Sequence, residues 1–277
     1  MQKRKDWENN SRIEGKIMKK SIKDWAKNNI EFVGNSYTNQ SGRRGYVPII
    51  IVDHITEGSC SSCINWFTNA GNYVSSAHFL VCKSGKVFQF VEIERCAWAN
   101  GLAKKNIYKA TSKVVRSMRV SPNWKSVTVE HEGIYNQTHG ALTPLQLAST
   151  IKLHEYIIQY VKDAYGHTIK ADKNHIIGHC EISPKRKVNC PGKLYPFTKV
   201  IEGLNKKEEK VLTMSDIRKI LGMKDVSDWG DPEIIKAQEN GLLLGKHKSD
   251  EIVQLGTLMT ILNRMYEKLK EELKETK

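Results

Sequence analysis

The sequence contains no apolar run long enough to cross a membrane. A bilayer-spanning helix needs about 20 consecutive apolar residues, and no segment of this 277-residue chain approaches that length. Residues 1–20 are basic and polar, without the apolar core of a secretory signal. We therefore expect a protein that is made in the cytoplasm without a signal peptide and does not insert into membranes. It would reach any extracellular target by another route.

Acidic residues are few relative to basic ones. There are 44 Lys and Arg residues against 30 Asp and Glu residues, which gives a net charge of +14. This excess favours an anionic partner such as nucleic acid, a membrane surface or an anionic cell-wall polymer; a generic basic surface is the alternative. No helix-turn-helix with a basic recognition face and no aromatic–basic RNA-binding motif occurs, so we expect no nucleic-acid partner.

Paired cysteine motifs are also missing. Cys60-Ser-Ser-Cys63 is a single CxxC, with no second CxxC or CxxH to complete a zinc ribbon and no βαβ pattern to suggest a redox site. We interpret it as structural or incidental. In a reducing cytoplasm the other cysteines are expected to remain thiols: Cys82, Cys96, Cys180 and Cys190.

Apolar patterning predicts an α/β fold with a central mixed β-sheet flanked by helices. Residues 47–52 form a continuous apolar run typical of a buried strand. Residues 79–82 and 87–91 flank a turn and predict a hairpin, and residues 125–135 alternate as a strand does. The strongest helix spans 143–166, with Thr and Pro at its start and Gly at its end. Strands and helices that alternate in this way indicate a sheet with helices packed on it.

Composition divides the chain into four segments. We expect a flexible N-terminal extension over residues 1–20, a main domain over 21–203, a charged linker over 204–210 and a small all-helical module over 211–277. The last segment reads as three short amphipathic helices and contains no candidate metal or acid–base cluster, so we interpret it as a non-catalytic accessory module.

Two distant segments carry the candidate chemistry. His54 ends a β-branched run, while His179 and Cys190 flank a lysine-rich loop that a Pro-Gly turn follows. Two imidazoles and a thiolate are a suitable ligand set for zinc when one coordination position stays open for water. The sequence therefore predicts a metal site made by these three residues.

Hydrolysis at such a site also needs a base and a cation. Glu130 is the preferred base because it faces away from the apolar side of its strand; Glu132 shares its strand face and is the rival. Lys187 is the preferred cation because the loop tethers it between two ligands, with Lys185 and Arg186 as competitors.

These residues resemble a known family, the zinc N-acetylmuramoyl-L-alanine amidases of the type-2 amidase fold, which is shared with peptidoglycan-recognition proteins. The similarity extends over residues 47–197. It rests on five segments in order: IIIVDHITEG, SAHFLVCKSGKVFQFVE, CAWANG, VTVEHEG and GHCEISPKRKVNCPG. The resemblance implies that His54, His179 and Cys190 bind Zn²⁺, that Glu130 is the general base and that Lys187 stabilises the oxyanion.

The chain departs from the family pattern at two positions. Many members place the basic residue two positions before the third ligand, where this chain has Val188, with Lys187 one position earlier. Ala77 replaces a tyrosine that some relatives carry before the hairpin histidine, so more of the catalytic burden falls on Glu130. His78 and Trp98 are the predicted substrate-binding residues; for Trp98 the alternative is a packing role.

The resemblance implies hydrolysis of the amide between N-acetylmuramic acid and L-alanine. From residue 225 onward the chain is similar to surface-layer-homology modules of Gram-positive phage lysins and wall proteins. We therefore expect a phage or prophage endolysin that acts on the cell wall after release, with peptidoglycan and anionic wall polymers as partners. The alternatives are a non-catalytic peptidoglycan-binding protein and a housekeeping or sporulation autolysin. The C-terminal helices could instead form a homodimer.

Overall fold

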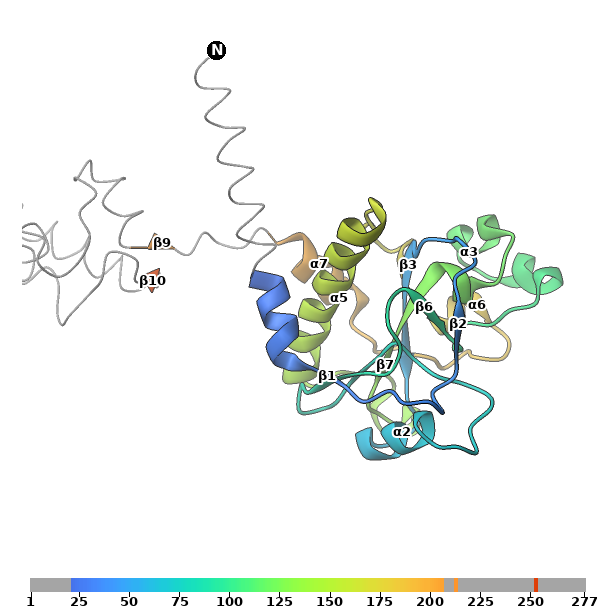
Figure 1. Cartoon of the computed structure of the whole chain (residues 1–277), viewed down its shortest axis with the longest axis horizontal. Coiled ribbons are helices and arrows are strands. Elements are labelled where there is room, and N and C mark those ends of the chain that lie inside the picture. The colour runs from blue at the N-terminus through green and yellow to red at the C-terminus, as the bar shows by residue number, and fades with distance from the viewer. Residues whose placement is uncertain (1–20, 207–211, 214–251, 254–277) are drawn as a thin grey trace, which may run out of the picture. The chain divides into compact units, whose positions relative to one another are not determined.

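The computed structural model describes residues 21–206, 212–213 and 252–253 (Figure 1). The chain divides into two units, residues 1–206 and 207–277. Among the described residues, no helix combines the length and the apolar character needed to cross a membrane. The predicted N-terminal extension lies outside the described residues.

A six-stranded mixed sheet forms the centre of the first unit, in the order β1-β5-β4-β7-β3-β8. Strands β4, β7, β3 and β8 run parallel, whereas β5 pairs antiparallel with β4 and parallel with β1. This arrangement confirms the predicted mixed sheet and the predicted hairpin. The strands are β1 (Ile30–Phe32), β3 (Ile50–Ile55), β4 (Phe79–Val81), β5 (Val87–Gln89), β7 (Ser126–His131) and β8 (Ile176–Gly178), with a separate antiparallel pair of β2 (Gln40–Gly42) and β6 (Arg95–Ala97).

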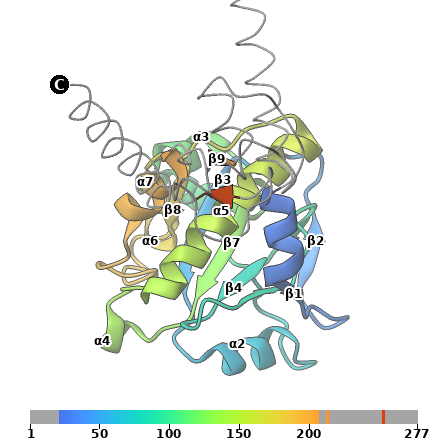
Figure 2. The ribbon, with the colours of Figure 1, turned by 90° about the vertical axis from the view of Figure 1, so that its left-hand side faces the viewer.

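Helices cover both faces of this sheet. Residues 21–29 are helical, and the remaining helices are α2 (Cys60–Phe67), η1 (Lys104–Lys109), α3 (Lys113–Met118), η2 (Pro122–Lys125), α4 (Tyr135–Thr138), α5 (Pro144–Tyr165), α6 (His179–Ile182) and α7 (Phe197–Asn205). Figure 2 shows α5 crossing in front of the sheet, between α7 and the N-terminal helix.

Helix α5 is the main support of one face. Thr143 and Gln146 form a capping box at its start, and Gly166 ends it in a left-handed conformation with φ 66°, which a residue without a Cβ adopts at little cost. Its buried residues Leu153, Ile157 and Val161 pack against the apolar side chains of β3, β4 and β7. The predicted helix over 143–166 is confirmed.

The opposite face is covered in two parts. Apolar residues of α3 and α6 pack over Ile50, Val52 and Ile177, and α2 packs over the β4–β5 hairpin. Strand β3 is therefore buried along its whole length, which explains why it reads as an apolar run and does not alternate.

Parallel pairing places the last residues of the central strands in register. His54 of β3 lies opposite Glu130 of β7, and Asp53 lies opposite Val129. Because side chains alternate between the two faces of a strand, His54 and Glu130 project from one face. Asp53 and His131 project from the other, towards α5. The central sheet thus separates two groups of polar side chains.

A disulfide joins Cys60 of α2 to Cys82, which follows β4. The Cα atoms of the pair are 5.6 Å apart, within the range that a disulfide requires. The prediction that Cys82 remains a thiol is therefore wrong. Cys63, Cys96, Cys180 and Cys190 are free.

Two predictions about the C-terminal segments need correction. Helix α7 continues to Asn205, so the predicted linker from residue 204 begins inside a helix. In the second unit, β9 (Leu212–Thr213) and β10 (Ile252–Val253) pair antiparallel, so the predicted all-helical module is wrong at these four residues. The three predicted helices lie outside the described part of the chain.

Candidate metal and active site

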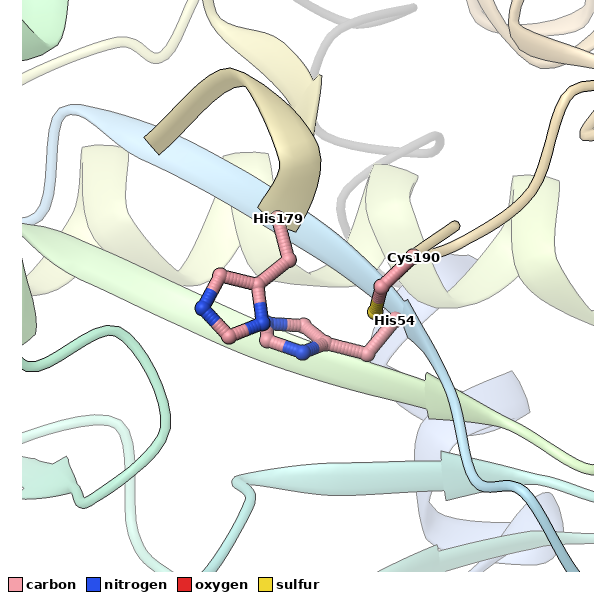
Figure 3. A group of neighbouring side chains, drawn as sticks. All are labelled: His54, His179 and Cys190. Carbon is pink, nitrogen blue, oxygen red and sulfur yellow. The ribbon is translucent and has the colours of Figure 1, made fainter. Parts of the chain in front are cut away.

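His54, His179 and Cys190 converge at one edge of the sheet (Figure 3). His54 is near the end of β3, and His179 begins α6 directly after β8. Because β3 and β8 are parallel neighbours, their carboxyl ends bring the two rings together, with centroids 4.3 Å apart. The ligand atoms of all three residues lie within 4.8 Å of one another.

The third candidate ligand is held by backbone contacts. The Cys180 N–H donates to the Cys190 carbonyl at 2.8 Å, and the Cys190 N–H donates to the Lys187 carbonyl at 3.0 Å. Beyond the cis peptide between Cys190 and Pro191, Gly192 adopts φ 125°. A Cβ added at Gly192 would lie 2.3 Å from the His139 carbonyl oxygen, so the loop approaches the neighbouring backbone too closely for any side chain.

Asn100 orients His54, and the sequence analysis missed this role. The Asn100 amide nitrogen donates to the Ser126 and Thr128 hydroxyls, at 2.9 Å each. Its oxygen therefore faces His54 and accepts from Nε2–H at 2.9 Å. Nδ1 then keeps its lone pair and is free to bind a metal. The only signal in the sequence was a polar residue within the CAWANG segment.

The protonation states suit a cation site. Burial lowers the pKa of both histidines, that of His179 to about 3, and the charge of Lys187 acts in the same direction. Both imidazoles are therefore neutral at pH 7 and able to act as ligands. Burial raises the pKa of the Cys190 thiol, and the nearby Glu130 charge adds to this. A bound cation would instead favour the thiolate.

Glu130 lies directly beside this cluster. Its Oε1 is 3.7 Å from Nδ1 of His54, and its Oε2 is buried without a hydrogen-bond partner in the described structure. Burial raises its pKa from 4.5 to about 8, although the charge of Lys187 opposes the shift. An unpaired buried carboxylate is costly, and a cation in the adjacent cluster would compensate for its charge.

These features fit a zinc ion. Zinc–nitrogen bonds of about 2.0–2.1 Å and zinc–sulfur bonds of about 2.3 Å place tetrahedral ligand atoms roughly 3.3–3.6 Å apart. The ligand atoms of the cluster lie within 4.8 Å of one another, so small side-chain movements would bring them to the spacing of a bound ion. Two neutral imidazoles and one thiol, with a carboxylate beside them, form a catalytic type of donor set that leaves one position open.

The geometry favours Glu130 over Glu132 as the base. The Glu132 carboxylate accepts a hydrogen bond from the Lys83 backbone N–H at 2.7 Å. It lies within 4.8 Å of the sulfur atoms of the Cys60–Cys82 disulfide. It is therefore engaged at the hairpin turn.

The loop between the second and third ligands carries exposed basic residues. The charge of Lys187 acts on both histidines, on Glu130 and on Cys190, which places Lys187 near the whole cluster. Arg186 acts on His179. Lys185 and Arg186 line a hollow of about 260 Å³ next to α6.

The two predicted substrate-binding residues differ in their accessibility. His78 is fully buried; its Nδ1 accepts from the Thr128 N–H and its Nε2–H donates to the Arg95 carbonyl, both at 3.0 Å. It therefore exposes no surface to a substrate. Trp98 is 38% exposed and donates to the Ser41 hydroxyl, so it remains available for contact.

The raised pKa of Glu130 predicts a pH-dependent stability of the metal-free protein. The folded state keeps a proton on Glu130 up to about pH 8, whereas an ordinary carboxyl loses it near 4.5. Unfolding thus releases a proton in this range, and stability falls as pH rises from about 4.5 to 8. Urea unfolding of the Glu130→Gln variant should show a smaller loss than wild type. Glu132→Gln retains Glu130 and should keep the wild-type slope; equal slopes for all three proteins would contradict the prediction.

Comparison with known proteins now places the chain. It is 26% identical over 154 residues to the 1,6-anhydro-N-acetylmuramyl-L-alanine amidase AmpD of Haemophilus influenzae, across 55% of this chain and 72% of that protein. A selenomethionine derivative of AmpD superposes with a TM-score of 0.48 at 21% identity, covering 64% of this chain and 95% of that one. The endolysin LysCS from Clostridium intestinale URNW gives 0.41 at 20% identity, covering 64% and 96%. Residues 43–193, more than half of the chain, match the family model described as N-acetylmuramoyl-L-alanine amidase. The protein therefore belongs to the N-acetylmuramoyl-L-alanine amidase family of peptidoglycan-cleaving enzymes.

Proposed function

We propose that the protein is a zinc-dependent amidase that cleaves the bond between the lactyl group of N-acetylmuramic acid and L-alanine. The observation that carries this proposal is the convergence of His54, His179 and Cys190 within 4.8 Å, with the unpaired carboxylate of Glu130 beside them. The three ligands come from separate segments of the family domain, and their convergence is stronger evidence for a metal site than any one of these residues alone.

The residues around the cluster divide the chemistry between them. A zinc ion held by the two histidines and the cysteine would polarise the scissile carbonyl and acidify a bound water. Glu130, as carboxylate, takes a proton from the water as its oxygen attacks the carbonyl carbon. It then returns the proton to the alanine nitrogen as the C–N bond breaks. Lys187 stabilises the negative charge on the carbonyl oxygen.

A binding role without catalysis is the competing reading. It would need no base and no complete ligand set. Cys190 supplies the third ligand, and Glu130 keeps one buried carboxylate oxygen without a hydrogen-bond partner, at a cost to folding. A protein that only binds peptidoglycan has no use for that cost, so hydrolysis accounts better for the site.

We further propose that the enzyme is an endolysin of a Gram-positive phage or prophage that acts on the wall after release. Its net charge of +14 suits an anionic wall. No acidic residue occurs between Glu94 and Glu130, a stretch with eight basic residues. Lys109 from this stretch lines the hollow next to α6 together with Lys185 and Arg186. A host autolysin with the same chemistry is the alternative, which genomic neighbours such as a holin gene would distinguish.

Product analysis tests the proposed reaction. Purified walls digested by the enzyme should gain free L-alanine amino groups and no reducing sugar ends. A chelator should abolish the release, and zinc should restore it. Cys190→Ser should lose most of the bound zinc, because a neutral hydroxyl replaces a soft thiolate. Reducing ends among the products, or a full zinc complement in Cys190→Ser, would overturn the assignment.

Replacement of the base separates binding from chemistry. Glu130→Ala should retain zinc but hydrolyse walls at least about 10²-fold more slowly, the usual scale for a general base. Glu132→Ala is the matched control from the same strand face and should stay within a few-fold of wild type. The reverse result, an inactive Glu132→Ala with a near-normal Glu130→Ala, would transfer the role to Glu132.

Truncation tests the proposal that residues 211–277 target the wall. A chain ending at Lys206, which retains the whole of α7, should keep its zinc and its turnover on small soluble muropeptides. Its activity on intact walls should fall, because the second unit would no longer raise the local enzyme concentration at the insoluble substrate. Undiminished wall binding by the truncated chain would instead favour dimerisation as the role of the C-terminal unit.

A further inference from the structure

A second polar cluster lies behind the metal site, on the face of the sheet that α5 covers. It consists of Asp53, His131, Thr150, His154 and Tyr195, which are all buried. None of them has a part in the proposed chemistry. Five polar side chains in one core region are costly unless each finds a partner, so their mutual contacts indicate what they hold in place.

Asp53 and His154 form the fixed end of this cluster. The His154 Nδ1 lies 2.8 Å from the Thr150 carbonyl oxygen, and its Nε2 lies 3.1 Å from a carboxylate oxygen of Asp53. Both ring nitrogens of His154 thus face oxygen atoms, one on its own helix and one on β3. This pairing ties α5 to β3 at the residue immediately before His54.

His131 connects the cluster to the first metal ligand. Its Nδ1–H donates to the backbone carbonyl of His54 at 3.0 Å. With Nδ1–H as the donor, the Nε2 of a neutral ring accepts a hydrogen. The Thr150 hydroxyl, 3.1 Å away, already donates to the Gln146 carbonyl at 2.7 Å. The remaining donor is the Tyr195 hydroxyl, at 3.3 Å from Nε2.

Tyr195 connects the same cluster to the third metal ligand. It follows Cys190 by five residues. Its ring packs edge-on against His131, with centroids 5.1 Å apart. The preceding Leu194 N–H donates to the His139 carbonyl at 2.8 Å. The segment that follows Cys190 is thus attached, through Tyr195, to His131, whose ring donates to the His54 carbonyl.

We propose that His131 and Tyr195 are positioning residues that set the separation of His54 and Cys190 from the opposite face of the sheet. The inference rests on the proposed zinc site. The link runs from Tyr195 through His131 to the His54 carbonyl. Its removal should release the Cys190 segment from β3 and weaken the binding of a metal that needs both ligands. Outer partners of metal ligands typically contribute about 10- to 100-fold in affinity.

The test compares two tyrosine variants. Tyr195→Phe removes only the hydroxyl that contacts His131 Nε2. Tyr156→Phe makes the same change at a half-buried α5 tyrosine that packs on Phe79 and has no contact with His54 or Cys190 in the described structure. Zinc affinity is measured by chelator competition, and the cobalt-loaded proteins are compared by their thiolate-to-cobalt absorption band, which reports the sulfur–metal contact.

We expect Tyr195→Phe to bind zinc about 10- to 100-fold more weakly and to shift or weaken the cobalt band, with Tyr156→Phe like wild type in both. His131→Leu should behave like Tyr195→Phe. His131→Asn should recover part of the affinity, because its amide can still donate to the His54 carbonyl. If His131→Leu does not fold, the tyrosine pair decides.

The outcomes separate this inference from the zinc proposal itself. Wild-type affinity and an unchanged cobalt band in Tyr195→Phe, even with lower stability, would show that the cluster only supports the fold. A wild-type protein without a bound zinc, or a thiolate band that persists in Cys190→Ser, would overturn the zinc site and the inference with it.

Discussion

The parallel pairing of β3 with β7 and β8 is the constraint on which the rest of the site depends. It places the carboxyl ends of three strands at one edge, so that His54, Glu130 and His179 meet although they are far apart in the sequence. The two-residue alternation of a strand then assigns each neighbour to the opposite face. A slip of the β3 register by one residue would exchange His54 with Asp53 and so remove one of the two imidazoles from this edge.

Elements whose ends are determined by neighbouring residues could be predicted from the sequence. The Thr and Pro at the start of α5, its final glycine and the turn of the β4–β5 hairpin depend on residues a few positions apart. The structure confirms the helix and the hairpin. The candidate ligands were also found from the sequence, since histidine and cysteine at such positions suggest a metal. The structure brings these residues together.

Contacts between distant segments left no such signal. Cys60 and Cys82 are 22 residues apart, and nothing near either residue indicates its partner. Asn100 gains its role only because β7 places two hydroxyls against its amide. His78 has a side chain that could bind a substrate, yet it lies in the core, where Thr128 of β7 supplies the hydrogen-bond partner for its Nδ1. Chemistry alone does not distinguish a buried histidine from a ligand; the fold decides it.

The close approach of Gly192 to the backbone at His139 gives the site a vulnerable point outside its chemistry. Substitution of a ligand removes a donor atom and leaves the scaffold in place. A side chain at position 192 would leave every donor atom present, but its Cβ would overlap the His139 carbonyl and push the Cys190 loop outward. The sensitivity of the proposed metal site to mutation is therefore set partly by this close contact between two backbone segments. Position 192 therefore has to be glycine for the Cys190 loop to keep its place.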